Sequence, residues 1–386
     1  MRASPTTVNQ GNSKMADSGA TTVLFSNVRA DHLVQRHHYV ARWRAESGRV
    51  IWLDTLGSRN PQLGDLRRIG GERAAQDPGA LLPGVEVVKP RFVPLFGAPF
   101  YGLNRRLLER QLAALEVDTS ASTAWVYLPH PVVVDLLKRR RWGRVVFDLC
   151  DDIDDMAVHP ALRKGEADLL READVVFATA EALVDKARRV RGGDVHYVPN
   201  GVDGARFGER VEPPGKLRRV LYVGAIYEWL DEDLVAAVAA ARADLEFRIV
   251  GPVRRPLPRL ERMANVSIPG PVAAADVPAE IAAAQLCMIP FRPGPLTEAT
   301  DPLKLYEALI AGRPVLATAL HQGERFAPAV RLEGTAEGWL RALADLESGE
   351  WSFDAVALRE RIAREEDWRE RFAQMERVLG AGTVAA

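Results

Sequence analysis

Apolar and polar residues follow two different patterns that alternate along the chain. Short runs of β-branched and other apolar residues, such as Thr22 to Phe25 and Val50 to Leu53, are separated by longer stretches with an apolar residue every three or four positions, such as Leu33 to Glu46. The short runs are typical of buried strands and the longer stretches of amphipathic helices. Because strands and helices alternate in this way in βαβ units, we expect an α/β protein with parallel sheets.

The pattern predicts two successive sets of strands and helices. The expected strands are Thr22 to Phe25, Val50 to Leu53, Val85 to Val88, Ala124 to Tyr127, Val145 to Phe147, Val175 to Ala178 and Val195 to Val198, then Arg219 to Val223, Phe247 to Val250, Val266 to Ile268, Leu286 to Ile289 and Pro314 to Ala317. The clearest expected helices are Leu33 to Glu46, Leu103 to Leu115, Val132 to Arg140, Glu181 to Val190, Glu232 to Arg242, Val277 to Ala284 and Pro302 to Ile310. A charged pattern from Asp354 to Leu379 predicts one long helix that packs against a domain surface.

A turn and a polar stretch separate the two sets. The turn is Pro199 to Asp203, and the stretch from Gly204 to Lys216 has no periodic apolar face. We therefore expect a disordered leader over 1–20, a Rossmann-like first domain over 21–203, a linker over 204–217, a Rossmann-like second domain over 218–353, and a helix with a tail over 354–386. No stretch approaches the apolar length of a membrane helix, about 18 residues.

Charge and cysteine usage limit the partners and the compartment. The 386 residues include 51 basic and 52 acidic side chains, for a net charge of −1. Because nonspecific binding to nucleic acids depends on a positive protein surface, we expect no nucleic acid partner. Cys150 and Cys287 form neither a disulfide framework nor a zinc pattern, and the leader lacks the apolar segment of a signal peptide, so a cytoplasmic location is favoured. Lysine is rare, which makes a lysine inside an apolar segment a candidate functional residue.

Two glycines at the ends of expected strands are candidates for ligand binding. The motifs Gly-x-Gly-x-x-Gly and Gly-x4-Gly-Lys-Ser/Thr are absent, which removes the main support for a dehydrogenase or an NTPase. Instead, Gly224 and Gly251 each follow a strand directly. Glycine at the carboxyl end of a parallel strand lets a nucleotide approach the backbone. A plain tight turn explains either glycine alone equally well.

The segment ATDPLKLYEAL predicts a helix start that suits an anion. Thr300 or Asp301 can cap this helix, with Pro302 at its first position. The cap would aim free backbone N–H groups at the preceding loop. Lys304 and Glu307 lie three residues apart and hence on one face of the helix. Lys304 would therefore suit a diphosphate, and an ion pair with Glu307 is the alternative.

Acidic residues gather after another expected strand, in the segment VVFDLCDDIDDMAVHP. Repulsion among its five carboxylates can raise the pKa of one member, as a general base requires. Asp152 and Asp154 also form an Asp-x-Asp metal motif, and a solvated loop with a capping aspartate is the alternative. His130, which follows the strand ending at Tyr127, is placed to face a cleft, although a structural histidine is more common at such a position.

Two basic stretches, Lys138 to Trp142 and Pro94 to Arg110, combine arginines with apolar residues. Basic amphipathic stretches bind anionic membrane surfaces, so a peripheral membrane contact is one interpretation. Solvated helix ends are the simpler interpretation on a charge-balanced protein.

The order of the motifs resembles the GT-B glycosyltransferases of the family 4 type. An Asp-rich loop is followed by Pro-Asn-Gly-Val-Asp, Tyr-Val-Gly, Ile-Val-Gly-Pro and Pro-Leu-Lys-Leu-Tyr-Glu-Ala-Leu-Ile-Ala-Gly-Arg-Pro-Val-Leu-Ala-Thr. The likeness spans Thr21 to Leu379 and is greatest to the branch that assembles bacterial polysaccharides and glycoconjugates. It implies two Rossmann-like domains facing a cleft, with the acceptor in the first domain, a nucleotide-sugar in the second, and a terminal helix that crosses back to the first.

The resemblance also assigns residues on the donor side. It implies that Glu307 binds the nucleotide ribose, that the backbone around Val272 meets the base, and that Gly224 borders the diphosphate. The chain departs from the family pattern at Ala299, where a glutamate is usual, and at Ala225, where an arginine is usual. Lys304 would replace that positive charge, as the corresponding lysine does in the similar xanthan glucuronosyltransferase.

The same likeness makes Asp151 the candidate base, ahead of Asp152 and His130. We therefore expect metal-independent transfer of a sugar from a nucleoside diphosphate sugar to a hydroxyl of a glycan, lipid-linked or small-molecule acceptor, with no cofactor, in the cytoplasm or at the inner face of the membrane. The expected donor site comprises Gly224, Gly251, Val272, Thr300, Asp301, Pro302, Lys304 and Glu307. A nucleotide-sugar 2-epimerase of the same fold and a noncatalytic nucleotide-sugar-binding subunit are the alternatives.

Overall fold

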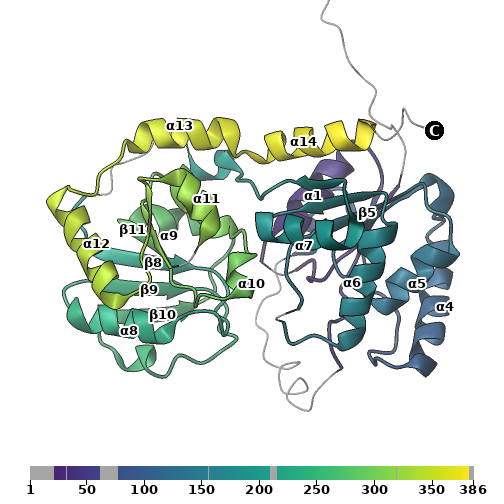
Figure 1. Ribbon diagram of the computed structural model, residues 1–386, viewed down its shortest axis with the longest axis horizontal. Helices are drawn as coiled ribbons and strands as arrows, with labels where there is room; N and C mark the ends of the chain where they lie inside the picture. Colours follow the sequence, from purple (N-terminus) through teal and green to yellow (C-terminus); the bar gives the residue numbers. More distant parts are fainter. Residues whose placement is uncertain are drawn as a thin grey trace, which may run out of the picture.

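The computed structural model describes residues 21–31, 33–60, 77–154, 156–208, 215–318 and 320–381. The leader expected over 1–20, part of the expected linker and the last five residues lie outside this description. Within it the chain forms two parallel sheets with helices packed on them, one from each half of the sequence (Figure 1). The predicted α/β class is therefore confirmed.

The first sheet has seven parallel strands in the order β3-β2-β1-β4-β5-β6-β7. Its strands are β1 Thr22–Phe25, β2 Val50–Leu53, β3 Val85–Val88, β4 Thr123–Val126, β5 Arg144–Leu149, β6 Val175–Ala178 and β7 Val195–Tyr197. Its helices are α1 Arg36–Ala45, α3 Pro78–Leu81, α4 Ala98–Ala114, α5 Pro131–Arg139, α6 Pro160–Glu172 and α7 Glu181–Arg191. The carboxyl ends of β1, β4 and β5 are neighbours, so the loops after them share one edge of the sheet.

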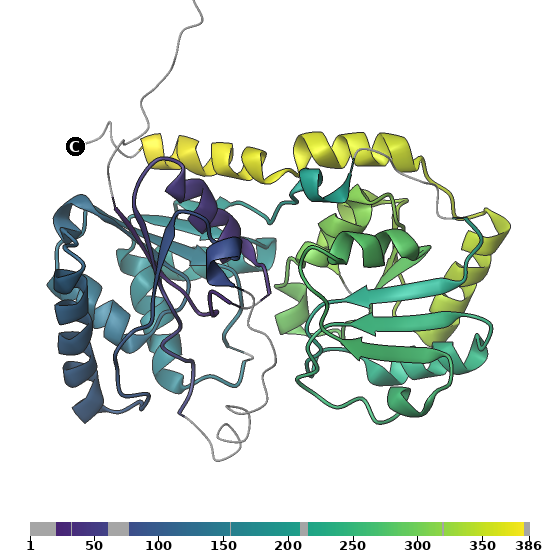
Figure 2. The same cartoon turned by 180° about the vertical axis from the view of Figure 1, so that it is seen from behind.

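The second sheet has six parallel strands in the order β10-β9-β8-β11-β12-β13. Its strands are β8 Arg219–Val223, β9 Glu246–Val250, β10 Val266–Gly270, β11 Leu286–Ile289, β12 Val315–Ala317 and β13 Val330–Leu332. Its helices are α8 Glu232–Ala241, α9 Val277–Ala283, α10 Pro295–Glu298, α11 Leu303–Ile310 and α12 Ala336–Ser348. In Figure 2 the carboxyl ends of these strands point toward the first domain.

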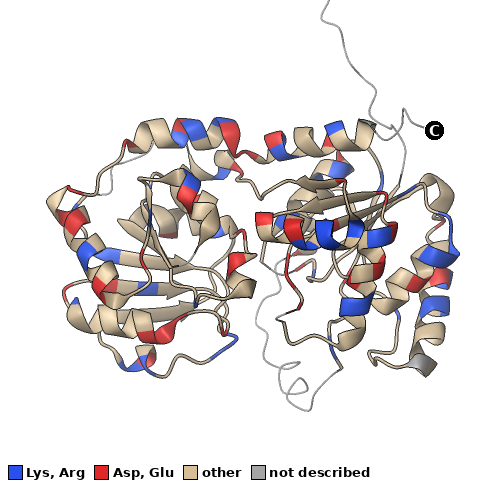
Figure 3. Cartoon of the chain, in the orientation of Figure 1, with Lys and Arg blue, Asp and Glu red and all other residues tan. Residues whose placement is uncertain are grey.

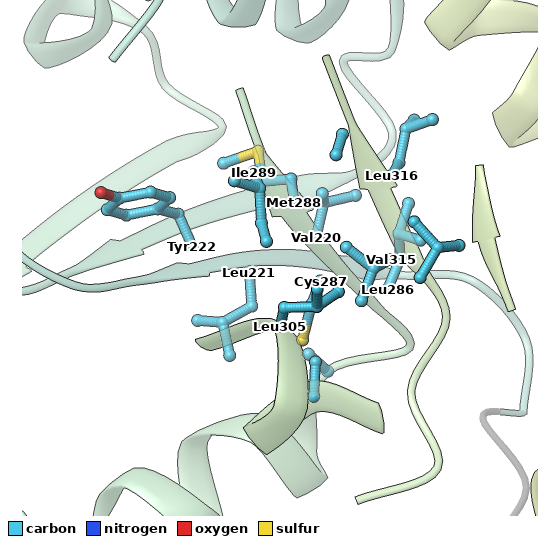
Figure 4. Close-up of a cluster of buried hydrophobic side chains, with 14 of the residues drawn as sticks. Val220, Leu221, Tyr222, Leu286, Cys287, Met288, Ile289, Leu305, Val315 and Leu316 are labelled. Carbon is cyan, nitrogen blue, oxygen red and sulfur yellow. The ribbon is translucent and has the colours of Figure 1, made fainter. Parts of the chain in front are cut away.

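Both sheets are buried on two faces, as near-continuous apolar strands require. In the second domain the central strands β8 and β11 contribute Val220, Leu221 and Met288 to a core that also includes Leu305 of α11 (Figure 4). Tyr222 extends from β8 away from the aliphatic side chains that are labelled with it (Figure 4). Its aromatic ring is buried in the core cluster, and its hydroxyl donates to the Ala225 carbonyl at 2.8 Å, just beyond the end of the strand.

The C-terminal segment differs from the single long helix expected over Asp354 to Leu379. It forms two helices, α13 Ala355–Glu365 and α14 Trp368–Ala381, which run end to end across both domains (Figure 1). The break lies where Val202 pairs with Asp367: the Val202 N–H donates to the Glu366 carbonyl at 2.8 Å, and the Trp368 N–H donates to the Val202 carbonyl at 3.1 Å. The backbone groups that leave the helix ladder are thus satisfied by the connection between the domains.

The two helices bind different domains. Ile362 of α13 belongs to the core of the second domain, whereas Met375 of α14 belongs to a core cluster of the first. Phe372 stacks on Trp43 of α1 with ring centroids 4.7 Å apart. The predicted crossing back to the first domain is confirmed, although one helix was expected to make it.

Sequence reasoning missed the short helices α3 and α10, and also α6, β13 and α12. Helix α6 contains Gly165, which weakens its helical signal; a Cβ atom there would overlap the Pro129 carbonyl, so the glycine permits close packing of α6 beside His130. Strand β13 is a short edge strand with an arginine at its centre, which interrupts the apolar run. Helix α12 has a buried face with Trp339 and Leu343, but its pattern was not recognised.

Candidate functional site

Gly224 and Gly251 meet at the carboxyl ends of β8 and β9. Both have backbone angles favourable only for glycine, with φ of 144° and 148°. A Cβ atom on Gly251 would overlap the Gly224 carbonyl, and one on Gly224 would lie 2.5 Å from the Lys304 Nζ. Gly251 is therefore required by the close approach of two backbone segments, and Gly224 by its backbone angle. The structure brings these two predicted residues and Lys304 together.

Lys304 lies in the first turn of α11 with its ammonium against an aromatic wall. Its Nζ donates to the Tyr222 hydroxyl at 2.8 Å and lies 4.0 Å from the centroid of the Tyr222 ring and 5.1 Å from that of Phe291. Burial lowers its pKa to about 7, and the charge of Glu307 only partly opposes this. Among the described residues no carboxylate forms an ion pair with it, so the expected alternative, a Lys304–Glu307 pair, is wrong. An anion is the ligand that would satisfy this site.

The predicted cap of this helix is wrong. Helix α11 begins at Leu303 with Pro302 in the capping position, and no side chain caps it. The Thr300 hydroxyl instead donates to the Leu296 carbonyl at 2.7 Å, because α10 ends directly before it. The Asp301 carboxylate instead accepts from the Asn200 N–H at 2.5 Å and from the Tyr306 hydroxyl at 2.7 Å.

These contacts give Asp301 a role between the domains. Asn200 belongs to the connection after β7, and its side-chain amide also donates to the Asp301 carbonyl at 2.6 Å. Burial raises the pKa of Asp301, and its hydrogen bonds oppose that shift. Asp301 thus fixes α11 relative to the first domain. Because Asp301 lies three residues before Lys304, these contacts also support the helix that carries the lysine.

Glu307 has a partner that sequence reasoning missed. Its Oε1 lies 3.4 Å from Nη1 of Arg206, which also donates to the Tyr39 hydroxyl at 3.1 Å and to the Ala274 carbonyl at 2.7 Å. Burial raises the pKa of Glu307, and Arg206 opposes the shift. Arg206 lies in a 3-10 helix, Gly204–Phe207, inside the expected linker. Apolar residues do not recur at regular spacing in that stretch, so its sequence predicted no structured element that would place Arg206 at the site.

Two further positions complete the donor side. Val272 follows β10 at the same sheet edge and packs partly against the second domain's core, which is where base recognition was expected. Ala299, at the position where the family pattern has a glutamate, is 2% exposed and packs with the hydrophobic cluster of the first domain. A carboxylate at position 299 would be buried there without compensation, which explains why the small apolar residue suits this chain.

Asp151 lies at the carboxyl end of β5, in the first domain. The residue is exposed, yet the protein around its carboxylate excludes enough water to raise its pKa, and a hydrogen bond from the Asn27 side chain opposes the shift. Asn27 follows β1, which is separated from β5 by β4 alone. The carboxylate is thus accessible, oriented and more basic than an ordinary aspartate, as a general base requires.

Asp152 and Asp154 both bind a lysine, although the Asp154 side chain remains 53% exposed. The Lys186 Nζ lies 2.7 Å from Asp152, 3.0 Å from Asp154 and 2.7 Å from Glu166. The alternative of a purely solvated loop is therefore wrong for Asp152. The Asp-x-Asp pair already surrounds an ammonium group, and among the described residues no group of three or more His, Cys, Asp and Glu is arranged to hold a metal ion.

His130 caps a helix. Its Nδ1 accepts from the Val132 N–H at 3.2 Å at the start of α5, and its ring packs on Phe96 with centroids 4.9 Å apart. Burial, and the nearby His159, lower its pKa to about 4, so its ring is neutral near pH 7. The side chain is 4% exposed, which fits the structural interpretation better than that of an accessible base.

Comparisons with known proteins agree with this geometry. Residues 218–347 match the family described as "Glycosyl transferases group 1". TuaH of Bacillus subtilis, named for a glycosyltransferase role in teichuronic acid biosynthesis, is 26% identical over 268 residues, which cover 62% of this chain and 67% of TuaH.

Solved structures match the fold over nearly the whole chain. Sucrose-phosphate synthase from Thermosynechococcus elongatus has a TM-score of 0.72 at 16% identity and covers 95% of this chain and 100% of its own. HepE of Anabaena, solved with UDP and glucose, has a TM-score of 0.65 at 15% identity, with coverage of 93% and 99%. The lipopolysaccharide outer core galactosyltransferase WaaB has a TM-score of 0.63 at 14% identity, with coverage of 94% and 99%. The two sheets therefore have the GT-B arrangement.

Proposed function

Because the chain is a glycosyltransferase with a group 1 domain over residues 218–347, we propose that it transfers a sugar from a nucleoside diphosphate sugar to an acceptor hydroxyl. The observation that carries this proposal is the site formed by Gly224, Gly251 and Lys304. It joins two strand-end glycines, where a side chain would not fit, to a partly buried lysine that forms no ion pair with a carboxylate of the described residues. A diphosphate supplies the negative charge that this arrangement lacks.

The donor lies, in this proposal, across the carboxyl ends of β8, β9 and β10. Its diphosphate contacts Lys304 and the backbone of Gly224, and the first-turn N–H groups of α11 point to the same charge. Glu307 binds the ribose once its contact with Arg206 yields, and the backbone around Val272 meets the base. HepE binds UDP, which supports a uridine nucleotide as the first donor to test.

The chemistry places the base in the other domain. An acceptor hydroxyl attacks the anomeric carbon of the donor sugar, and the bond from that carbon to the diphosphate oxygen breaks. Asp151 takes the proton of the hydroxyl, a contribution of about a hundred- to ten-thousandfold in rate. Lys304 stabilises the charge that develops on the leaving diphosphate. No step in this scheme requires a metal ion or an organic cofactor.

The acceptor in this proposal is a glycan, either lipid-linked or free, with a small molecule as the alternative. The name of TuaH places that relative in teichuronic acid biosynthesis, which supports the glycan class. We propose that the protein works in the cytoplasm, where nucleotide-sugars are made, without a nucleic acid partner. No helix in the described part of the chain has the length and apolar character needed to cross a bilayer.

A peripheral contact with an anionic membrane is part of this proposal. Lys and Arg segments gather on α4 and α5, at the edge of the first domain (Figure 3). Leu95 and Leu103 are 41% and 47% exposed beside them. Sedimentation with phosphatidylglycerol vesicles tests the contact, and equal binding by the wild type and an Arg106→Glu, Arg110→Glu variant would contradict it.

A donor panel tests the proposed function. UDP-glucose, UDP-galactose, UDP-N-acetylglucosamine, UDP-glucuronate and GDP-mannose are screened by thermal shift, since a ligand at a hundred times its Kd stabilises the fold by about 2.7 kcal/mol. The donor that binds is then incubated with and without glycan acceptors. We expect nucleoside diphosphate release and a new glycosidic product.

The same experiment separates the two alternatives. An epimerase would convert the nucleotide-sugar with no acceptor present, and a noncatalytic subunit would bind the donor without turnover. Absence of binding to every member of the panel, together with absence of nucleoside diphosphate binding by calorimetry, would contradict the donor site itself.

A further inference from the structure

The loop after β5, Cys150 to Asp154, is held at nearly every residue. The Thr179 hydroxyl donates to the Cys150 carbonyl at 3.4 Å, and the Asn27 side chain is near enough to the Asp151 carboxylate to lower its pKa. Ile153 is 6% exposed and packs with Leu128 and Leu162. These contacts keep the loop rigid. A reacting group on a rigid loop is already in position, so no reorganisation is needed before the reaction.

Lys186 provides the strongest of these contacts. It projects from α7 and binds Asp152 and Asp154 of the loop together with Glu166 of α6, all at 2.7 to 3.0 Å. The Asp152 carboxylate that it holds also accepts from the Asp154 N–H at 3.0 Å. The ammonium therefore crosslinks the loop to two helices that pack on each other (Figure 1).

The burial of this cluster shows that it is more than a surface ion pair. The side chains of Lys186, Asp152 and Glu166 are 11%, 17% and 5% exposed. Burial raises the pKa of Glu166 to about 7, so this carboxyl is partly protonated near neutral pH. The cluster therefore carries less negative charge than three ionised carboxylates would give it. The hydrogen bonds that Lys186 donates to Asp152 and Glu166 overcome its desolvation and raise its pKa, so its charge is permanent.

We propose that Lys186 is a positioning residue for catalysis: its ammonium replaces a divalent cation between Asp152 and Asp154 and thereby fixes Asp151 at the acceptor. This inference rests on the proposed role of Asp151 as the base. Lys186 binds Asp152, the residue directly after Asp151, and so acts on the reacting carboxylate through the backbone. A change at Lys186 should therefore alter the rate of transfer and leave donor binding unchanged.

The test uses the full chain with Lys186→Met, Lys186→Arg and a matched control, Lys138→Met. Lys138 also binds two carboxylates, Asp168 and Glu172 at 3.1 Å, and Asp168 lies on α6 as Glu166 does, but it does not touch the loop. Turnover is measured as UDP release from UDP-glucose, or from the panel sugar that binds, and donor affinity is measured by calorimetry with UDP.

We expect Lys186→Met to lower kcat by about ten- to hundredfold with UDP affinity within about twofold of the wild type. Lys186→Arg restores most of the rate, and Lys138→Met has wild-type kcat. Hydrogen exchange at 150–154 should be faster in Lys186→Met alone, because the Asp154 N–H loses its oriented acceptor.

A second variant keeps the test valid if Lys186→Met folds poorly. Lys186→Met with Glu166→Gln removes the buried carboxylate that would be left unpaired, so the fold is retained while the loop stays unheld. If either variant keeps wild-type turnover and exchange while Asp151→Asn is inactive, the inference is wrong and the proposed base stands. Retained turnover in Asp151→Asn would overturn the base, and the role of Lys186 with it.

Discussion

Two lysines with little solvent exposure, one in each domain, have opposite surroundings. Lys304 in the second domain contacts the Tyr222 hydroxyl and aromatic rings, and burial lowers its pKa to about 7. Lys186 in the first domain contacts three carboxylates, which raise its pKa. Lys304 thus lacks a negatively charged partner, whereas the positive charge of Lys186 is balanced by carboxylates.

The difference assigns the two lysines to different tasks. A buried ammonium without a carboxylate is unfavourable until an anion arrives, so part of its desolvation cost is recovered on binding. An ammonium already surrounded by carboxylates gains nothing from a ligand and can only hold the protein together. Lys304 therefore points to a ligand and Lys186 to the geometry of the loop that carries Asp151.

The largest effect is expected at the residue that Lys186 serves. Asp151→Asn should lower transfer by about a hundred- to ten-thousandfold, because an amide cannot take the hydroxyl proton. UDP affinity should be nearly unchanged, since Asp151 lies in the first domain and the proposed nucleotide site in the second. Steady-state kinetics and calorimetry measure the two quantities.

The controls for this prediction are Asp152→Asn and His130→Ala. The first removes one carboxylate that binds Lys186, and the second removes a helix cap. Both should impair transfer less than Asp151→Asn does. If either is the more damaging and Asp151→Asn keeps near-normal turnover, the base is another residue.

The next effect is expected at Lys304. Lys304→Met should weaken UDP binding by about ten- to hundredfold, because a charge-assisted contact in a desolvated site contributes about 1.5–3 kcal/mol. Lys216→Met, at an exposed lysine of the same domain, is the matched control and should bind UDP normally. If the wild type, Lys304→Met and Lys216→Met bind UDP with equal affinity, Lys304 has a purely structural role.

A smaller and graded effect is expected from pH. With a pKa of about 7, Lys304 is protonated below neutrality and loses its proton as the pH rises. A bound diphosphate favours the charged form, so UDP affinity should fall by about tenfold per pH unit above 7 and binding should take up a proton. Calorimetry in buffers of different ionisation enthalpy detects that proton. Lys304→Arg should remove the dependence, and a flat profile in the wild type would show that Lys304 is not the titrating group.

Much of the fold could be predicted because its strands are buried and continuous. Every expected strand is present, with ends that differ by two residues or fewer. The errors lie where local pattern and tertiary contact disagree. The cap of α11 was wrong because Asp301 bonds Asn200 across the domains, and the single C-terminal helix was wrong because Val202 pairs with the backbone at its centre.

The site could be predicted only in part, for the same reason. Gly224, Gly251 and Lys304 are each visible as strand-end glycines or as a lysine in an apolar run, and the structure brings them together. Arg206 and Lys186 were missed because nothing in their own segments distinguishes them from surface charges. Their significance depends on partners about a hundred residues away for Arg206 and at least 20 residues away for Lys186.

Removing divalent ions is expected to have the smallest effect, namely no change in activity. The reason is that each of the two lysines supplies a positive charge that a metal ion would otherwise supply. If the positive charges that a metal would supply come from Lys304 at the diphosphate and Lys186 at the Asp-x-Asp loop, then EDTA should leave kcat and KM as they are. The Lys186 Nζ already lies within 3.0 Å of Asp152 and Asp154, so a cation would have to displace a permanent charge to reach them. Turnover is measured in EDTA and again after Mn²⁺ or Mg²⁺ is added. Loss of activity that either ion restores would mean that the loop binds metal during catalysis, and that Lys186 yields to it.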